Sequence, residues 1–415
     1  MHWTHDTDVP SVVGVTVETP VRSWTGHERG SIEYRRLLAA LFCAGVATFA
    51  QLYSPQAVLP LIARDLNTGA AASALMVSAS TIGLAVGVIA WSSLADRVGR
   101  VRAMALSVGI ATILGLAVPF VPTFQLLLAG RFVEGLALGG VPAIAVAYLT
   151  EEIEAGHAAR AAGTYVAGTT IGGLLGRVVA APVAEWVGWR MGMFAVALLC
   201  SAAAFGFIKL APAPRGFRPG GDDDAGSLGH RLWVNLRSVR QLALYLQGFL
   251  LMGGFVAMYN FLGFRLSAPP FGLPQTVVSL VFLAYLAGTW ASARAGACAS
   301  RYGRRPVLLS SILVMMVGVG ITLSDNIVAV LVGLLVATSG FFGAHAIASG
   351  WTGQLATVGK AQASSLYNLA YYAGSSAIGW FGGLAFDAAG WTAVAVTIVV
   401  LDVLAVVVAA AVLRD

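Results

Sequence analysis

The sequence contains little charge: 11% of its 415 residues are Asp, Glu, Lys or Arg, whereas 58% are hydrophobic and the mean hydropathy is +0.81. A soluble protein of this length needs a more polar surface, which excludes a single soluble core. The hydrophobic residues come instead in runs of about 20 to 25, the length that crosses roughly 30 Å of hydrocarbon at 1.5 Å per residue. We therefore expect an all-α membrane protein with the lipid bilayer as its main solvent.

Cysteine is scarce as well. The three cysteines, Cys43, Cys200 and Cys298, lie in or beside hydrophobic runs and have neither CxxC nor Cys/His spacing, which excludes a disulfide framework and a zinc motif. The sequence also lacks GxSxG and HExxH, and no early apolar segment follows basic residues, so no cleavable signal peptide is indicated. We expect no enzyme activity, no cofactor and no metal.

The basic residues are scattered singly between the apolar runs and form no continuous basic face, although the net charge is +6. We therefore expect no nucleic-acid partner. Short loops rich in Lys and Arg remain in the cytoplasm, and nearly all of these residues fall on the side of the N-terminus, with only Arg64, Arg190 and Arg265 on the other. The pattern predicts a multi-pass protein of the bacterial inner membrane with both termini in the cytoplasm.

Twelve hydrophobic runs are arranged as six on each side of a polar gap. The predicted spans are 37–62, 73–94, 102–121, 124–149, 158–182, 188–211, 240–264, 274–297, 305–324, 327–350, 361–385 and 390–412. The gap contains several Pro and Gly residues and three consecutive aspartates, which is typical of a solvated linker, and a short amphipathic helix could form near Leu232 to Leu236. The predicted organisation is a disordered cytoplasmic tail (1–35), a six-helix bundle (36–211), a cytoplasmic linker (212–239) and a second bundle (240–415).

The two halves resemble each other in sequence. Residues 96–100 (DRVGR) recur as residues 300–304 (SRYGR). A second set recurs 202 positions later in the chain, where Tyr165, Gly172, Glu185, Gly188 and Trp189 match Tyr367, Gly374, Asp387, Gly390 and Trp391. We interpret the halves as copies of one unit, an organisation typical of repeat-built transporters.

Residues 94–100 (LADRVGR) resemble the GxLaDrxGrr signature of the major facilitator superfamily, and more narrowly of its drug:proton antiporter branch, which includes bacterial arabinose-efflux-like permeases. Ser92 replaces the opening glycine of the signature, and in the second copy Ser300 replaces its aspartate. The resemblance covers about residues 35 to 412. It implies twelve transmembrane helices in two pseudo-symmetric six-helix bundles.

This resemblance also implies a cytoplasmic gate, formed by Asp96, Arg97, Gly99 and Arg100 in the first half and by Arg301, Gly303 and Arg304 in the second. A carboxylate such as Asp96 could meet the positive N-terminus of span eleven near Ser364 and Ser365. Arg100 could pair with Glu151 or Glu152. Our hypothesis is that these contacts close the cytoplasmic side and break as the halves rock; the alternative is a loop that only fixes orientation.

Span four contains two charged residues, Arg131 and Glu134, in a segment similar to the family's RxxqG motif. A charge inside a span costs about 2.5 to 3.5 kcal/mol on insertion scales, so both side chains should face protein or water, and three positions apart they can pair. Glu134 could bind and release a proton beside Arg131, or the two could form a permanent structural pair. His345 in span ten is the other candidate for proton coupling, or is simply a hydrogen-bonded buried histidine.

Span five is similar to the antiporter motif GxxxGPxxGG over residues 168–177 (GTTIGGLLGR), with Gly173 in place of the proline and Arg177 in place of the last glycine. Glycines four positions apart favour close packing against a neighbouring helix. The charge of Arg177 could attract an anionic or hydroxyl-rich solute, or it could be neutralised by Glu185.

Members of the family hold their substrate at the midplane between the halves. The polar and aromatic candidates for such a cavity are Gln51, Tyr53, Gln56, Tyr165, Arg177, Tyr259, Asn260, Tyr285, Tyr367, Asn368, Tyr371 and Tyr372. Amides and tyrosines can hydrogen-bond hydroxyls while their apolar parts pack on rings or chains, which suits a sugar-like or amphipathic small molecule. Alternatively, about half of these residues only tether helices.

The resemblance implies secondary active transport by alternating access, in a protein expected to be monomeric and to use protons as its coupling ion. Efflux of a small organic solute or drug is the expected function, and proton-coupled uptake of a small polar or amphipathic solute is the alternative. The family is too varied for its motifs to name a substrate.

Overall fold

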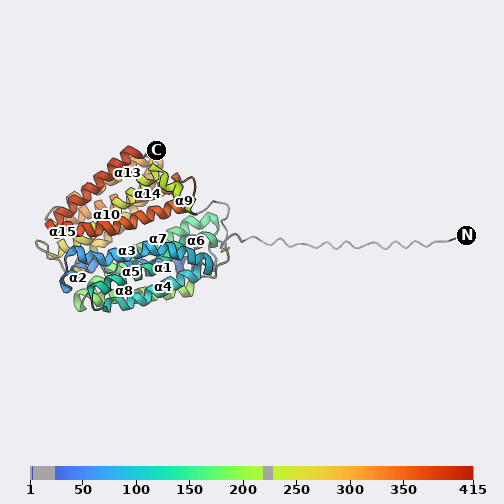
Figure 1. Cartoon of the computed structure of the whole chain (residues 1–415), viewed down its shortest axis with the longest axis horizontal. Coiled ribbons are helices and arrows are strands. Elements are labelled where there is room, and N and C mark those ends of the chain that lie inside the picture. The colour runs from blue at the N-terminus through green and yellow to red at the C-terminus, as the bar shows by residue number, and fades with distance from the viewer. Residues whose placement is uncertain (1, 3–23, 218–227, 415) are drawn as a thin grey trace.

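The computed structural model describes residue 2 and residues 24–217 and 228–414. The described residues are almost entirely helical and form two bundles, the first coloured blue to green and the second yellow to red in Figure 1. Most of the predicted tail (3–23) and the middle of the predicted linker (218–227), including its aspartate run, lie outside the described residues.

Six membrane-crossing stretches build the N-terminal bundle. They are α1 (Ile32–Tyr53) with η1 (Gln56–Val58) and α2 (Leu59–Asp65), α3 (Ala70–Val98), α4 (Arg100–Ala117) with η2 (Val118–Phe120), α5 (Phe124–Leu138) with α6 (Gly140–Glu152), α7 (Ala155–Val187), and α8 (Trp189–Leu210). α1 begins before the predicted start at 37, because the Ser31 hydroxyl accepts a hydrogen bond from the Tyr34 amide at 3.1 Å and caps the helix.

The rest of the chain starts with α9 (Leu228–Arg237), which contains the predicted amphipathic segment. The C-terminal bundle follows, with α10 (Val239–Ser267), α11 (Gln275–Ser279) with η4 (Leu280–Ala284) and α12 (Tyr285–Tyr302), α13 (Arg304–Ile321), α14 (Ile327–Leu355) and α15 (Lys360–Val412). The Asn235 side chain donates to the Val358 carbonyl at 2.9 Å, which fastens α9 to the C-terminal bundle.

Among the described residues, eleven helical stretches are long and apolar enough to cross a bilayer. One of them, the 53-residue α15, contains two membrane crossings, because Ala389 and Gly390 have non-helical backbone angles and divide it into two helices. The chain therefore has the twelve transmembrane helices that the sequence predicts.

Four glycines form tight turns between successive helices. Gly99 and Gly303 have φ angles of +94° and +89°, and Gly188 and Gly390 have φ angles of +92° and +65°. A β-carbon is strained in this left-handed region, which explains why glycine stands at each turn. The two pairs are those that match in the repeated sequence, so the halves share backbone geometry as well as helix order.

The predicted glycine ridge of α7 packs on α1. A β-carbon at Gly176 would lie 2.3 Å from the Ala50 carbonyl oxygen, and one at Gly172 would lie 2.6 Å from the α-carbon of Val46. The two backbones therefore touch along this line, as small residues allow inside a membrane.

Candidate functional site

Two acidic residues hold the bundles together at the end of the molecule that carries the Gly188 and Gly390 turns, here called the far end. The Asp387 carboxylate of α15 accepts hydrogen bonds from the amides of Ala70 (2.9 Å) and Ala71 (3.1 Å), the first residues of α3. Glu185 of α7 accepts from the Thr276 amide at 2.9 Å and from the Thr276 hydroxyl. These repeat-related residues form two matching clamps between the bundles.

Further contacts continue from the far end toward the middle of the molecule. Thr81 of α3 and Ser376 of α15 share a hydrogen bond of 2.7 Å between their hydroxyl oxygens. The Ser78 hydroxyl donates to the Ser376 carbonyl at 3.2 Å. Gln56 of η1 also donates to Asn260 of α10 at 2.6 Å, which adds another hydrogen bond between the bundles.

At the opposite end, called here the linker end, the Asp96 motif makes contacts inside the N-terminal bundle alone. Arg100 donates to Asp96 at 2.6 Å and to Glu151 of α6 at 2.8 and 3.0 Å, so one of the predicted pairings is present. Asp96 is 60% exposed and has no hydrogen bond to the start of α15 among the described residues. The contact between Asp96 and the start of α15 that the latch hypothesis needs is therefore absent among the described residues in this conformation.

The other acidic residue at the end of α6, Glu152, does not contact Arg100. Its carboxylate accepts from the amides of Arg215 and Gly216, each at 2.7 Å, and its carbonyl accepts from the His27 amide at 2.7 Å. Residues 24–31 of the predicted tail therefore pack against the N-terminal bundle together with the start of the linker.

The second copy of the motif has a different arrangement. Arg304 lies over the Trp351 ring at 5.9 Å from its centroid, and Arg301 lies over the Tyr302 ring at 5.1 Å. Gly303 forms the turn, as Gly99 does in the first copy, where Arg97 is exposed in the last turn of α3.

Inside the N-terminal bundle, Arg131 and Glu134 form a completely buried ion pair at 2.7 Å, and both side chains are 0% exposed. Gln51 donates to the other Glu134 oxygen at 2.5 Å. Arg131 also donates to the carbonyls of Leu52 (2.7 Å) and Met76 (3.1 Å), so it joins α1, α3 and α5. Gln51, a predicted substrate residue, is therefore part of this ion-pair cluster.

In the C-terminal bundle, His345 of α14 meets two tyrosines of α15. Its Nδ1 lies 2.9 Å from the Tyr367 hydroxyl, and its ring centroid lies 4.9 Å from that of Tyr371, which packs edge-on against Tyr372 at 5.2 Å. His345 is only partly buried. The second candidate for proton coupling is therefore surrounded by predicted substrate residues.

Arg177 of α7 lies where α1, α10 and α12 meet, and it is 2% exposed. Its Nε donates to the Gln56 amide oxygen at 2.8 Å, and Gln56 in turn donates to Asn260 at 2.6 Å. The rings of Tyr53, Phe282 and Tyr285 surround the guanidinium, with centroids at 4.3, 4.7 and 5.0 Å from its central carbon. We call these residues and Arg177 the Arg177 cluster. Glu185 contacts Thr276 instead of Arg177, so the predicted neutralisation is absent.

A chain of aromatic rings connects the Arg177 cluster to His345. Tyr285 packs on Phe255 at 5.3 Å, Phe255 stacks on Phe341 at 3.8 Å, and Phe341 stacks on His345 at 5.8 Å. Phe255 and Phe341 of this row of rings were not predicted. A phenylalanine inside an apolar helix looks the same in sequence whether it lines a binding site or packs in the hydrophobic core.

Three predicted substrate residues remain. The Tyr259 hydroxyl hydrogen-bonds Thr338 at 2.8 Å and tethers α10 to α14, and its ring packs beside those of Phe282 and Tyr285 in the Arg177 cluster, with centroids 5.1 and 4.9 Å apart. Tyr165 is buried in the apolar core of the N-terminal bundle. Asn368 is exposed on α15. Asp402 of α15 is buried, with neither carboxylate oxygen hydrogen-bonded within the described residues.

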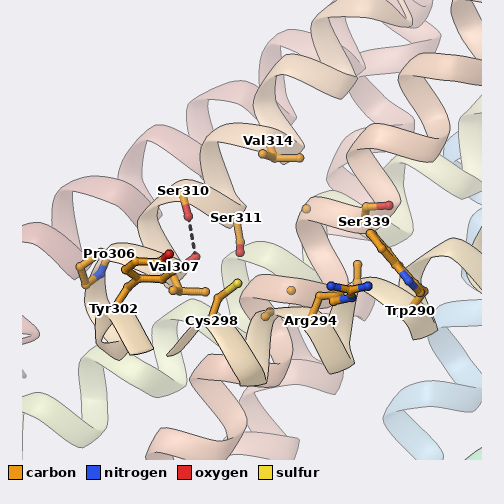
Figure 2. A pocket seen from close by; sticks show the side chains of 14 residues that line it. Trp290, Arg294, Cys298, Tyr302, Pro306, Val307, Ser310, Ser311, Val314 and Ser339 are labelled. Atoms are coloured by element: carbon orange, nitrogen blue, oxygen red, sulfur yellow. Dashed lines mark hydrogen bonds between the residues drawn. The ribbon is translucent and has the colours of Figure 1, made fainter. Parts of the chain in front are cut away.

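A separate groove of about 570 Å³ lies between α12, α13 and α14 in the C-terminal bundle (Figure 2). Trp290, Arg294 and Cys298 of α12 line one side, and Ser310 and Ser311 of α13 line the other. None of the predicted site residues lines it.

Comparison with known proteins agrees with this architecture. The sequence profile of the Major Facilitator Superfamily matches residues 40–294. The inner membrane transport protein YnfM of Escherichia coli (strain K12) is 38% identical over 92% of this chain and 91% of its own, and the uncharacterized MFS-type transporter YybF of Bacillus subtilis (strain 168) is 37% identical over 88% and 90%. A crystal structure of a bacterial homolog of the human lysosomal transporter Spinster has a TM-score of 0.73 at 14% identity, covering 92% of this chain and 96% of that one. The chain belongs to the major facilitator superfamily of membrane transporters.

Proposed function

We propose that this transporter couples proton movement to the efflux of a small organic solute. The observation that carries the proposal is the Arg131–Glu134–Gln51 cluster, a carboxylate with 0% exposure held between three helices of one bundle. A buried carboxylate is costly unless it is paired or protonated, so a rearrangement that separates Glu134 from Arg131 would favour proton uptake. His345, beside Tyr367 and Tyr371, is the second candidate.

Alternating access is supported by where the bundles touch. Under the positive-inside rule the linker end lies in the cytoplasm, so the clamps at Asp387 and Glu185 close the outer side. The exposed Asp96 and its lack of a contact with α15 in the described chain fit an open cytoplasmic side. Together these observations support an inward-facing state.

Efflux is favoured over uptake by the glycine ridge of α7, which resembles the antiporter motif and packs backbone to backbone on α1. Proton-coupled uptake uses the same residues, but the proton crosses the membrane in the same direction as the solute instead of the opposite direction. The two directions differ in the proton movement that a solute triggers.

The test is a solute screen in energised inside-out vesicles with a fluorescent pH probe. If the protein exports its solute by antiport, adding the solute to these inside-out vesicles should release protons from their acidic lumen. If it imports the solute by symport, adding the solute to de-energised right-side-out vesicles should make the external medium more alkaline. Glu134→Gln should abolish the pH response, and the exposed Glu28→Gln should retain it. An undiminished response in Glu134→Gln would exclude Glu134 as the coupling site. A response that requires sodium would refute proton coupling.

A further inference from the structure

Arg177 is a buried cation without a carboxylate partner. None of the ion pairs among the described residues includes it, and two carboxylates of the same bundle at the far end are engaged elsewhere, Glu185 with Thr276 and Asp65 with Trp189 at 2.8 Å. Arg131 differs, because Glu134 balances its charge. An uncompensated charge at membrane depth is expensive and marks a functional position.

A neutral amide occupies the place that a carboxylate would take on Arg177. The Gln56 oxygen accepts from both Nε and Nη2, the edge of the guanidinium that binds carboxylates with two parallel hydrogen bonds. Replacing this amide oxygen by an anion makes the same hydrogen bonds and adds the missing charge.

A second donor beside Gln56 has no acceptor. Asn260 is 1% exposed, and its Nδ2 makes no hydrogen bond in the described structure, although its Oδ1 accepts from Gln56. A buried amide donor without an acceptor costs about as much as a lost hydrogen bond. An acidic ligand at Arg177 would supply such an acceptor.

The surface that leads away from Arg177 is aromatic. Tyr285, His345, Tyr371 and Tyr372 are each only partly buried, and the ring chain through Phe255 and Phe341 lies behind them. Such rings favour a flat apolar body through stacked and edge-to-face contacts.

We propose that the substrate is a small organic carboxylate with an aromatic or similarly flat body, and that Arg177 and Asn260 bind its carboxylate. This inference rests on the proposed transport function and names its substrate class. The carboxylate displaces Gln56 from Arg177. Since Gln56 also bridges to Asn260 of the other bundle, binding loosens one of the contacts that join the bundles near the far end.

The experiment measures equilibrium binding to the purified full chain in lipid nanodiscs at pH 7, without any gradient. The probes are benzoate, salicylate and cinnamate, each paired with its uncharged primary amide. We expect at least one carboxylate to bind tenfold or more tightly than its amide. Binding of none of the three carboxylates at millimolar concentration, or equal affinity within every pair, would overturn the proposal.

Three variants locate the anion. Arg177→Gln should reduce carboxylate affinity tenfold or more while amide affinity stays within twofold, and Arg177→Lys should lie between. Gln56→Glu supplies an internal carboxylate to Arg177, so it should abolish carboxylate binding and raise the thermal unfolding midpoint. It therefore tests the idea even if Arg177→Gln does not fold. A role of Arg177 in packing alone predicts no effect of Gln56→Glu on carboxylate binding, a result that would also overturn the proposal.

Arg294, an exposed arginine that lines the groove of Figure 2 outside the Arg177 cluster, is the control. Arg294→Gln should leave carboxylate affinity unchanged, and a loss there instead would place the anion in the groove and refute the site at Arg177. Arg177-dependent binding without proton-coupled flux would disprove the transport proposal and leave the substrate class intact. Proton-coupled flux of neutral solutes without such binding would support the transport proposal and disprove the substrate class.

Discussion

All three guanidinium nitrogens of Arg131 donate hydrogen bonds, a set of contacts that no other side chain can make. It donates to Glu134 and to the carbonyls of Gln51, Leu52 and Met76, at the place where α1 ends at Tyr53. A lysine keeps the charge but has a single ammonium group with no planar fork. The residue therefore stabilises a helix break as well as the acid beside it.

We predict that Arg131→Lys lowers the free energy of unfolding by about 2 to 3 kcal/mol, because it leaves buried carbonyls without donors. The midpoint of thermal unfolding in detergent measures the loss. Arg102→Lys, at an exposed position of α4, is the control and should unfold like the wild type. Equal midpoints for both variants would show that the fork contacts contribute little.

Among the helices, the contact between α1 and α7 depends on the absence of side chains. A methyl group at Gly176 would lie 2.3 Å from the Ala50 carbonyl oxygen, whereas Gly163 of the same helix has nothing within 4 Å. We predict that Gly176→Ala destabilises the protein by about 1 to 3 kcal/mol through overpacking. Gly163→Ala should be neutral or stabilising, since alanine favours helix. The midpoints of thermal unfolding compare the two variants. A Gly176→Ala protein as stable as the wild type would contradict the close packing of α7 on α1.

Under the proposed alternating access, the clamps at Asp387 and Glu185 should stabilise the conformation in which the far end is closed. Hydrogen bonds to a charged group contribute about 1.5 to 3 kcal/mol, and 1.4 kcal/mol is a factor of ten in an equilibrium. We therefore predict that the double variant Asp387→Asn, Glu185→Gln increases opening at the far end at least tenfold.

A cysteine at Ser78, which is buried between the bundles, reports this opening through its reaction rate with a membrane-impermeant maleimide in a background without native cysteines. The rate should rise in the double variant. Asp65→Asn is the control, because Asp65 contacts Trp189 within one bundle. An unchanged rate in the double variant would mean that other contacts keep the far end closed.

For the whole molecule, charge placement predicts the orientation in the membrane. The linker end carries most arginines, so we predict that green fluorescent protein fused after the C-terminus fluoresces and that alkaline phosphatase at the same place is inactive. A phosphatase fused after Gly188, at the far end, should be active. The reverse pattern would invert the topology and make the present conformation outward-facing.

Much of the whole fold was predictable. Apolar runs of spanning length, the polar gap and the repeated segments led to twelve spans in two bundles, and the turn glycines and the Arg100 pair with Glu151 were found where the repeats and the motif place them. Apart from the Arg100–Glu151 pair, which joins positions 51 apart and was expected from the motif, these features depend on residues close together in sequence or on composition alone. The start of α1 was not predicted correctly, because it depends on the N-cap residue Ser31, a single side chain that lies outside the apolar run.

The sequence by itself determined that this chain crosses a membrane twelve times as a duplicated unit, because hydropathy and spacing act within each helix. Only the tertiary structure decided the partners of its buried charges. Arg177 meets Gln56 across 121 positions, and Gln56 meets Asn260 across 204. The first contact is set by how α7 packs on η1 inside the N-terminal bundle, and the second by how the two bundles pack against each other. The same packing placed Glu185 on Thr276 and thereby left Arg177 without a carboxylate among the described residues.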